Sequence, residues 1–279
     1  MAHFEWYHPI AVSTLWAILM ITLERRWPRD PGQRLFRDGF FLDFFWYTIF
    51  EGALLGFIIS ALIMQIDARS GASRLHLLAS WPVAAQLTLF WVMHDLYIYW
   101  FHRLQHSNRF LWRVHEAHHS GKDVDWLSGS RSHSLEILIN QTIEYAPITL
   151  LGAHPDVAVL KGMLDATWGM FIHSNIAVRM GWLQYVFNGP EMHRWHHSAD
   201  SDRAVNFATK IAAWDWLFGT AYRPARGPKT YGLWGDPPFP RGYFAQHLWA
   251  FRPQPSPHEA TLAAFDRPSS TGGSELSID

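Results

Sequence analysis

Long stretches of uncharged residues alternate with polar segments along the first third of the chain. No Asp, Glu, Lys or Arg occurs in residues 9–23 or 75–93, and Glu51 is the single charge in residues 44–66. A helix needs about 20 residues to cross the hydrocarbon core of a bilayer, so each stretch has about the length of a membrane span. We therefore expect apolar helices near residues 9–26 and 43–66, and a third that begins near residue 76. Buried helices of a large soluble protein are the alternative.

A further apolar segment is expected to form a helical hairpin. Its arms are residues 135–152 and 157–172, and they meet at a Gly-Ala-His-Pro turn. Each arm has a carboxylate within its apolar part, Glu144 in the first and Asp165 in the second, which is costly inside a membrane and so indicates a functional role. We interpret both carboxylates as groups that hold a metal-binding imidazole in one tautomer.

Composition narrows the chemistry that the chain can perform. Charged residues make up 17%, below the roughly 25% of soluble domains. The 23 basic and 24 acidic side chains leave no excess charge for a nucleic-acid partner. The absence of cysteine excludes disulfides, iron–sulfur clusters, haem-thiolate chemistry and Cys-based zinc sites. Any metal must therefore be held by imidazole, and 17 histidines are present.

The histidines are clustered at helical spacings. His102 and His106 lie one turn apart on a helix, whereas His94 lies about 80° around it from His102 and is a less favoured ligand. The pattern His-x₂-His-His then occurs twice, at 115–119 and 193–197. The candidate ligands are His102, His106, His115, His118, His119, His173, His193, His196 and His197. One tetrahedral zinc ion uses three or four protein ligands, so nine candidates indicate two metal ions, with the adjacent pairs splayed between them.

The basic loop after the first helix sets an orientation. It contains Arg25, Arg26, Arg29, Arg34 and Arg37, and such loops are usually cytoplasmic. Counting the expected membrane crossings from this loop places all histidine groups on the cytoplasmic side of the membrane as well. The predicted fold is an all-α integral membrane bundle of about four transmembrane helices, with a cytosolic-face helical cap that carries the histidines. Three regions are expected: residues 1–89 with the first helices, 90–224 with the histidines, and a Pro/Gly-rich tail, 225–279, which ends in a disordered stretch.

The histidine groups also match a known family pattern. His102-Arg103-x₂-His106, His115-x₂-His118-His119 and His193-x₂-His196-His197 resemble the three histidine boxes of the fatty acid hydroxylase/sterol desaturase superfamily. Two flanking segments resemble the same family: Asp95-x₃-Tyr99-Trp100, and Asn206-Phe207 followed by Trp214-Asp215-x-Leu217-Phe218-Gly219-Thr220. The resemblance covers about half of the chain.

This resemblance implies a diiron enzyme that hydroxylates or desaturates a lipid with O₂. Two iron ions would be the cofactor, and each turnover needs two external electrons. Because the sequence contains no flavin, haem or iron–sulfur motif, we expect a separate electron-donor protein. A bacterial inner membrane is favoured over the endoplasmic reticulum, with the active site on the cytoplasmic side.

One departure from the family pattern concerns the ligand set. Some lipid hydroxylases of the superfamily have His-x₃-His where this chain has Gly169-x₃-His173, so one iron would have an open position or take another ligand such as His94. A further set of side chains is expected to support the ligands without binding metal: His94, Asp95, Tyr99, His133, Asn206 and Asp215. His133 has two open interpretations, one as such a support or a contact to the substrate headgroup, the other as a residue that begins a helix.

Two other functions compete with the oxygenase. A histidine-rich membrane metal transporter would place ligands along a crossing path at mid-membrane depth. A haem-binding electron carrier would use paired histidines as axial ligands.

Overall fold

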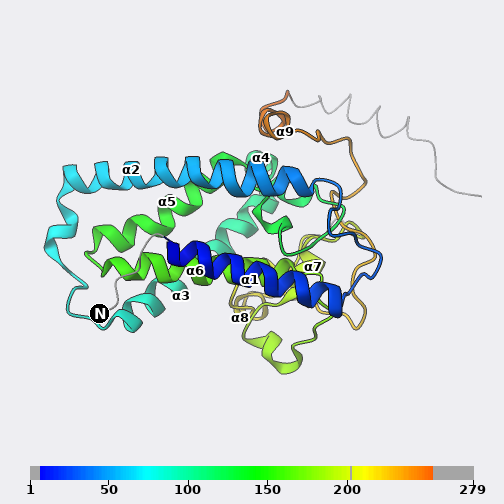
Figure 1. Cartoon of the computed structure of the whole chain (residues 1–279), viewed down its shortest axis with the longest axis horizontal. Helices are drawn as coiled ribbons and strands as arrows, with labels where there is room; N and C mark the ends of the chain where they lie inside the picture. The colour runs from blue at the N-terminus through cyan, green and yellow to red at the C-terminus, as the bar shows by residue number, and fades with distance from the viewer. Residues whose placement is uncertain (1–6, 202, 254–279) are drawn as a thin grey trace, which may run out of the picture.

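The computed structural model describes residues 7–201 and 203–253, and it confirms the all-α class (Figure 1). The long helices are α1 (Tyr7–Arg26), α2 (Gly52–Ser70), α3 (Val83–Ser107), α5 (Ser134–Leu150) and α6 (Pro155–His173). The shorter helices are α4 (Arg109–His119), α7 (Pro190–His196), α8 (Ala213–Leu217) and α9 (Tyr243–Trp249). A π-helix, η1 (Leu42–Glu51), continues into α2, and there are 3₁₀ turns η2 (Ala72–Leu75), η3 (Ser128–Ser130) and η4 (Gly181–Tyr185).

The long helices lie alongside one another, and α7 lies at the end of the bundle where the loop from α1 to η1 turns (Figure 1). α1 packs against α6, and α2 packs against α5. Backbone hydrogen bonds join the loop to the segment after α6: Ala177 N donates to Trp27 O, and Arg29 N donates to Asn175 O. The basic loop and the end of α6 that carries His173 therefore share one end of the bundle.

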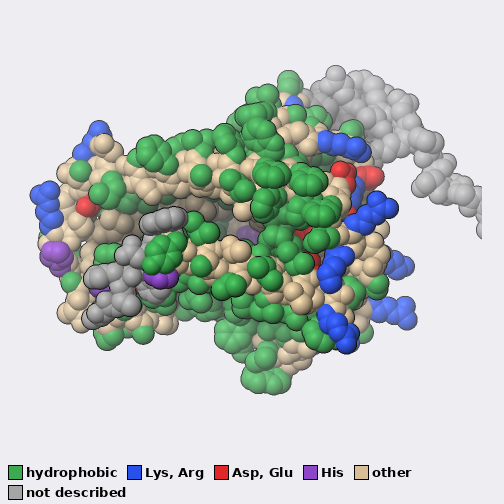
Figure 2. Space-filling view, in the orientation of Figure 1, with side chains coloured by type: hydrophobic (Ala, Val, Ile, Leu, Met, Phe, Trp, Pro, Cys, Tyr) green, Lys and Arg blue, Asp and Glu red, His purple; other side chains and the backbone are tan. Residues whose placement is uncertain are grey.

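Among the described residues, two helices are long and apolar enough to cross a membrane: Tyr7–Arg26 and the continuous helix Leu42–Ser70. Many of their large apolar side chains face outward, with Leu15 68% exposed and Phe57 75% exposed. Figure 2 shows apolar side chains over the flank of the bundle and Lys and Arg side chains near its two ends. An apolar surface of this extent marks a membrane or partner contact.

The third helix begins at Val83 rather than near residue 76, so the predicted start was wrong. His76 has a left-handed backbone, with φ of 50°, and Pro82 is the extended residue that precedes the helix. A residue before proline, here Trp81, is also biased away from helical geometry. Residues 76–82 therefore form a turn that passes beneath the α5–α6 connection, where Leu78 N donates to Leu151 O.

The predicted tail contains a packed helix, α9. Tyr47 of η1 donates its hydroxyl to Gln246 Oε1 at 2.5 Å, and α9 also contacts α4. The disorder expected for residues 269–279 lies outside the described residues.

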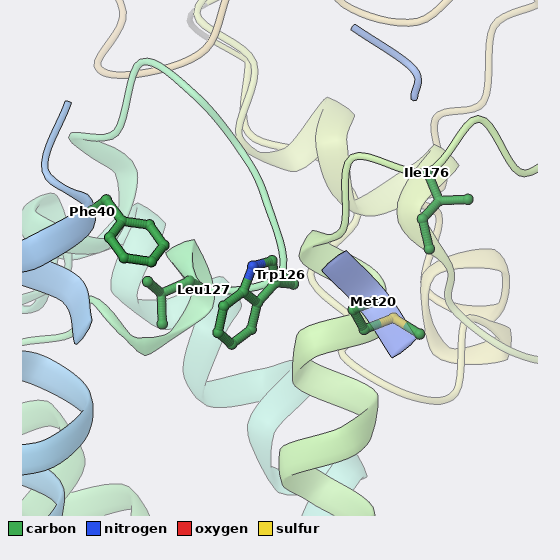
Figure 3. Packing of buried hydrophobic residues seen from close by; sticks show 5 residues of the cluster. All are labelled: Met20, Phe40, Trp126, Leu127 and Ile176. Carbon is green, nitrogen blue, oxygen red and sulfur yellow. The ribbon is translucent and has the colours of Figure 1, made fainter. Parts of the chain in front are cut away.

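An apolar cluster joins four segments that are distant in the sequence (Figure 3). Met20 comes from α1 and Phe40 from the loop before η1. Trp126 and Leu127 come from the segment between α4 and α5, and Ile176 follows α6. Burying such a side chain contributes roughly 1.5–3 kcal/mol, so the cluster fixes these connections against one another.

A buried ion-pair network reinforces the same end of the bundle. Arg37 donates to both oxygens of Asp125 at 2.8 Å, and Arg131 donates to both oxygens of Asp43 at 2.7 and 2.9 Å. Gly39 allows this approach because a Cβ at its position would lie 2.5 Å from Arg131 Nη2, and its φ of +80° is one that other residues rarely adopt. The segment before α5, in which the Arg131 carbonyl meets His118, is thereby held in place.

Candidate metal centre

Four helices bring the nine candidate histidines to one place. α3 supplies His102 and His106, α4 supplies His115, His118 and His119, and α6 ends on His173. α7 supplies His193 and His196, and His197 follows directly. Seven of the nine are buried and the other two, His106 and His118, are half-buried.

The nine histidines separate into two groups. The five-histidine group contains His102, His106, His115, His119 and His196, and the four-histidine group contains His118, His173, His193 and His197. Within each group, one ring nitrogen per residue lies within 4.8 Å of all the others. The adjacent pairs His118-His119 and His196-His197 are split between the groups, because neighbouring residues on a helix point about 100° apart.

The partners of the ring Nδ1 atoms fix the tautomer of five imidazoles. Four of these atoms lie near backbone carbonyls: His102 near Phe207 at 2.8 Å, His118 near Arg131 at 3.0 Å, His173 near Gly169 at 2.8 Å and His196 near Val205 at 2.8 Å. The fifth, that of His115, lies 2.9 Å from Glu136 Oε1. Carbonyl oxygens and an ionised carboxylate can only accept, so Nδ1 must carry the proton and Nε2 presents a lone pair.

These Nε2 atoms converge closely. His115 Nε2 lies 3.1 Å from that of His102 and 3.2 Å from that of His119. In the other group, the Nε2 atom of His173 lies 2.9 Å from that of His193 and 3.2 Å from that of His197. Ligands bound at about 2.1 Å and at right angles are about 3.0 Å apart, so both groups fit a metal ion. Imidazole suits iron, zinc, copper and nickel.

Burial also favours the neutral imidazoles that metal binding needs. Desolvation lowers the pKa of His118, His196 and His197 below the usual range for imidazole, and neighbouring imidazoles lower the pKa of the last two further. The rings therefore stay neutral near pH 7, with their Nε2 lone pairs available.

Asp95 and Asp215 hold the loop that orients two of the imidazoles. Asp95 accepts from Lys210 N at 3.0 Å and from Ile211 N at 2.9 Å, and Asp215 accepts from Phe207 N at 2.8 Å. This loop carries the carbonyls of residues 205 and 207 that meet His196 and His102. The two aspartates thus have the supporting role that was expected: they bind the loop, and the carbonyls of the loop bind the candidate ligands.

Asn206 and Tyr99 brace the same loop. Asn206 has a left-handed backbone, with φ of 56°, and its side-chain amide donates to Met192 O and Tyr222 O at 2.8 Å. Its Oδ1 accepts from Tyr222 N. The Tyr99 hydroxyl pairs with Thr220 Oγ1 at 2.9 Å.

His94, Glu144 and Asp165 lie in a separate cluster. Lys161 Nζ donates to Glu144 Oε1, to Asp165 Oδ2 and to His94 Nδ1. The prediction that Glu144 and Asp165 hold a ligand imidazole was wrong, because they pair with the buried Lys161 and the imidazole beside them is that of His94, which belongs to neither histidine group. The structure therefore does not make His94 the substitute for the histidine that some members of the superfamily have where this chain has Gly169.

His133 begins a helix, as one of its two interpretations held. Its Nδ1 accepts from Leu135 N at 3.0 Å and it caps α5.

The functional residue that the sequence analysis missed is Glu136, three positions after His133. A signal was present, since Glu136, Asn140 and Glu144 recur every four residues and mark one polar face on an apolar helix.

Two cavities flank the histidines and have no lining residue in common. The outer cavity, of about 300 Å³, is bordered by His106, His119 and His196, by Trp112, and by polar loop residues such as Ser198 and Arg203. The inner cavity, of about 230 Å³, lies among α3, α5 and α6. Its lining includes His102, His115, His118, His173 and His193, and at its far end His94, Glu144 and Asp165. The inner cavity therefore borders both histidine groups, and the outer cavity borders only the five-histidine group.

Comparison with known proteins adds a family match over this region. Residues 87–220 match the fatty acid hydroxylase family model. The chain is 34% identical over 168 residues to ornithine lipid hydroxylase OlsE of Rhizobium tropici, which covers 60% of this chain and 50% of the relative. It is 30% identical over 142 residues to human alkylglycerol monooxygenase, covering 50% of this chain and 31% of that protein.

A plant relative is also similar. Methylsterol monooxygenase 2-2 of Arabidopsis thaliana is 26% identical over 160 residues, covering 56% of this chain and 60% of the relative. The chain thus spans between about a third and 60% of the length of these relatives. No solved structure gives a significant match.

Proposed function

We propose that this protein is a membrane-bound oxidoreductase that hydroxylates a lipid with O₂, because residues 87–220 match the fatty acid hydroxylase family model. Three relatives are named for ornithine lipid, alkylglycerol and methylsterol, which supports a lipid as the substrate class. Desaturation is the variant outcome of the same chemistry. The observation that carries the proposal is the convergence of nine imidazoles in two groups beside a cavity.

The cofactor in this proposal is a pair of iron ions, one in each histidine group. Bound iron supplies the redox chemistry with O₂ that oxidises an unactivated C–H bond. The balance is one substrate, one O₂, two electrons and two protons in, and one hydroxylated product and one water out. The electrons would come from a separate donor protein.

The protein's own groups have two tasks in this reaction. The carbonyls of Phe207 and Val205 and the carboxylate of Glu136 hold imidazoles with Nε2 facing inward, so little reorganisation is needed. The inner cavity offers a lipid apolar lining residues such as Ile98 and Trp168 beside the imidazoles, and a lipid segment packed against them would keep water away from the reacting carbon. Its volume corresponds to about eight water-sized groups at about 30 Å³ each, so it fits a segment of a lipid.

In the proposed membrane arrangement, α1 and η1–α2 are complete spans, and α3 with the α5–α6 hairpin brings the total to about four. The Arg25–Arg37 loop would be cytoplasmic, and the histidines lie at its end of the bundle. A bacterial inner membrane is proposed, with the oxidation at its cytoplasmic side.

The competing functions fit the geometry less well. A transporter needs metal ligands along the bundle, but the deeper group of His94, Glu144 and Asp165 already binds the Lys161 ammonium. A haem needs a flat space between two axial ligands, whereas Nε2 atoms here are 2.9–3.2 Å apart.

The test is lipid turnover by the purified protein in nanodiscs with iron, O₂ and a reductant, followed by mass spectrometry. We expect a product 16 mass units heavier, or 2 units lighter for desaturation. The His196→Ala variant should lose both the product and bound iron. The matched control is His76→Asn, an exposed histidine at the far end whose left-handed backbone suits asparagine. Lipid oxidation that persists in the His196→Ala variant would rule out the histidine cage as the catalytic centre.

A further inference from the structure

A basic surface cavity of about 680 Å³ lies beside α7, at the same end of the bundle as the histidines. Five cations and two carboxylates line it, which gives a net formal charge of +3, although the whole chain has a net charge of −1. The cations are Arg29, Arg179, Arg194, Arg226 and Lys229. None of them takes part in the chemistry proposed above.

The most informative of these cations is Arg194, which is only 3% exposed. Its guanidinium donates to the carbonyls of Ser174 and Ile176. Among the described residues, no carboxylate oxygen lies within 4.0 Å of it. A buried charge without a counter-ion is costly, so this position favours an anion.

Two further arginines leave donors free at the same cavity. Arg29 pairs with Asp30 through Nη1 at 3.1 Å. Its Nη2 atom lies so close to Gly227 that a Cβ atom at position 227 would be only 2.6 Å from it. Glycine at 227 therefore makes room for this guanidinium. Arg226 is exposed and has no ion pair or hydrogen bond from its side chain within the described part of the chain.

The cavity lies at the level where lipid headgroups are expected. The candidate span α1 ends at Arg26, and Trp27, which is 54% exposed, is placed as an interfacial anchor. Arg29 follows two residues later, at the wall of the cavity. Basic pockets at the ends of membrane helices are suited to anionic headgroups.

We propose that this cavity binds the phosphate group of an anionic membrane phospholipid. Arginine is the preferred partner of phosphate, because its planar guanidinium donates two parallel hydrogen bonds to adjacent oxygens. The bound phosphate would neutralise Arg194. It would also tie the loop after α1 to α7, the helix that carries His193 and His196, so that anionic lipid stabilises this part of the histidine cage.

The test measures the unfolding midpoint of the purified full chain in a neutral detergent, during titration with one of three additives. These are phosphatidylglycerol, phosphatidylcholine and inorganic phosphate. We expect phosphatidylglycerol to raise the midpoint, and the other two to have little effect. This readout does not depend on enzymatic activity, so it can fail or succeed independently of the proposed oxygenase function.

Variants locate the effect. Arg226→Gln should weaken the apparent affinity for phosphatidylglycerol about fivefold, as expected for one basic residue at a membrane surface. Arg226→Lys, which keeps the positive charge, should retain most of the affinity for phosphatidylglycerol. Arg69→Gln removes an exposed arginine at the opposite end of the bundle and should behave as wild type. Since the exposed Arg226 side chain makes no ion pair or hydrogen bond with residues 7–201 or 203–253, we expect its substitution to leave folding intact.

Two results would overturn the proposal. An equal response to phosphatidylcholine and phosphatidylglycerol, or an unchanged affinity in Arg226→Gln, would show that the cavity is not an anionic-lipid site. A stabilisation that inorganic phosphate alone reproduces in full would assign the cavity to a free phosphate and overturn the lipid as its occupant.

Discussion

Glu136 Oε1 on α5 lies 2.9 Å from Nδ1 of His115 on α4. This contact orients a candidate ligand through a carboxylate, whereas the imidazoles of His102, His118, His173 and His196 meet backbone carbonyls. A carboxylate partner makes an imidazole a more basic ligand and fixes its ring orientation. A side chain, unlike a carbonyl, can be replaced without altering the backbone, so this contact can be tested directly.

Glu136→Gln should lower the affinity for iron, because the amide has no negative charge to support the His115 ring. Loss of such a partner typically costs about 10–100-fold in metal affinity. The measurement is iron content after titration against a competing chelator. Glu116→Gln is the matched control, since Glu116 adjoins His115 in the chain but pairs with Arg252. Wild-type affinity in Glu136→Gln would contradict a role for this carboxylate.

Lys161→Met should destabilise the bundle strongly. Lys161 is 0% exposed and pairs with Glu144 and Asp165. Asp165 also pairs with Lys210, so the loss of Lys161 leaves Glu144 as the buried carboxylate without a lysine partner, at a cost of about 3–5 kcal/mol. The double variant Lys161→Met/Glu144→Met should recover part of this loss. The free energy of unfolding in detergent measures both. Lys122→Met, which removes a half-exposed pair with Asp236, should cost at most about 1 kcal/mol. Equal losses for the two lysines would show that the buried network contributes no special stability.

Gly169→Leu should block the inner cavity without displacing the helices. A Cβ at Gly169 has no atom within 4 Å, and this glycine lines the cavity. We expect reduced lipid oxidation, or oxidation at a different carbon, with normal iron content, as read by mass spectrometry of the product. Gly56→Leu is the control, because this glycine of α2 also has open space around its Cβ position but lies away from the cavity. Unchanged product from Gly169→Leu would mean that the substrate does not use the inner cavity.

The spacing of the histidines carried most of the site prediction. In His115-x₂-His118-His119, helical geometry alone sends His118 one way and His119 the other, and the structure places them in different groups. The α5–α6 hairpin was predicted within a few residues, because Gly152 and Pro155 mark its turn.

Other features depend on contacts between segments that are distant in sequence. Lys161 and Asp165 are one turn apart and could be read as a pair, but nothing local shows that Glu144 and His94 join them. Glu136 meets His115 only because α4 and α5 pack together. The π-helix at 42–51 and the helix α9 in a Pro-rich region are likewise stabilised by partners in space, as Tyr47 and Gln246 are by each other.

The separation of the two cavities has a kinetic consequence for metal removal. A hydrophilic chelator such as EDTA can approach along the polar loops of the outer cavity, where it meets His106, His119 and His196 of the five-histidine group. The four-histidine group borders only the inner cavity, within the helices. Iron should therefore leave in two phases of similar amplitude. A bulky substitution of Ser198, which lines the outer cavity, should slow the fast phase. A single exponential loss of both ions would indicate that the two groups open to water together.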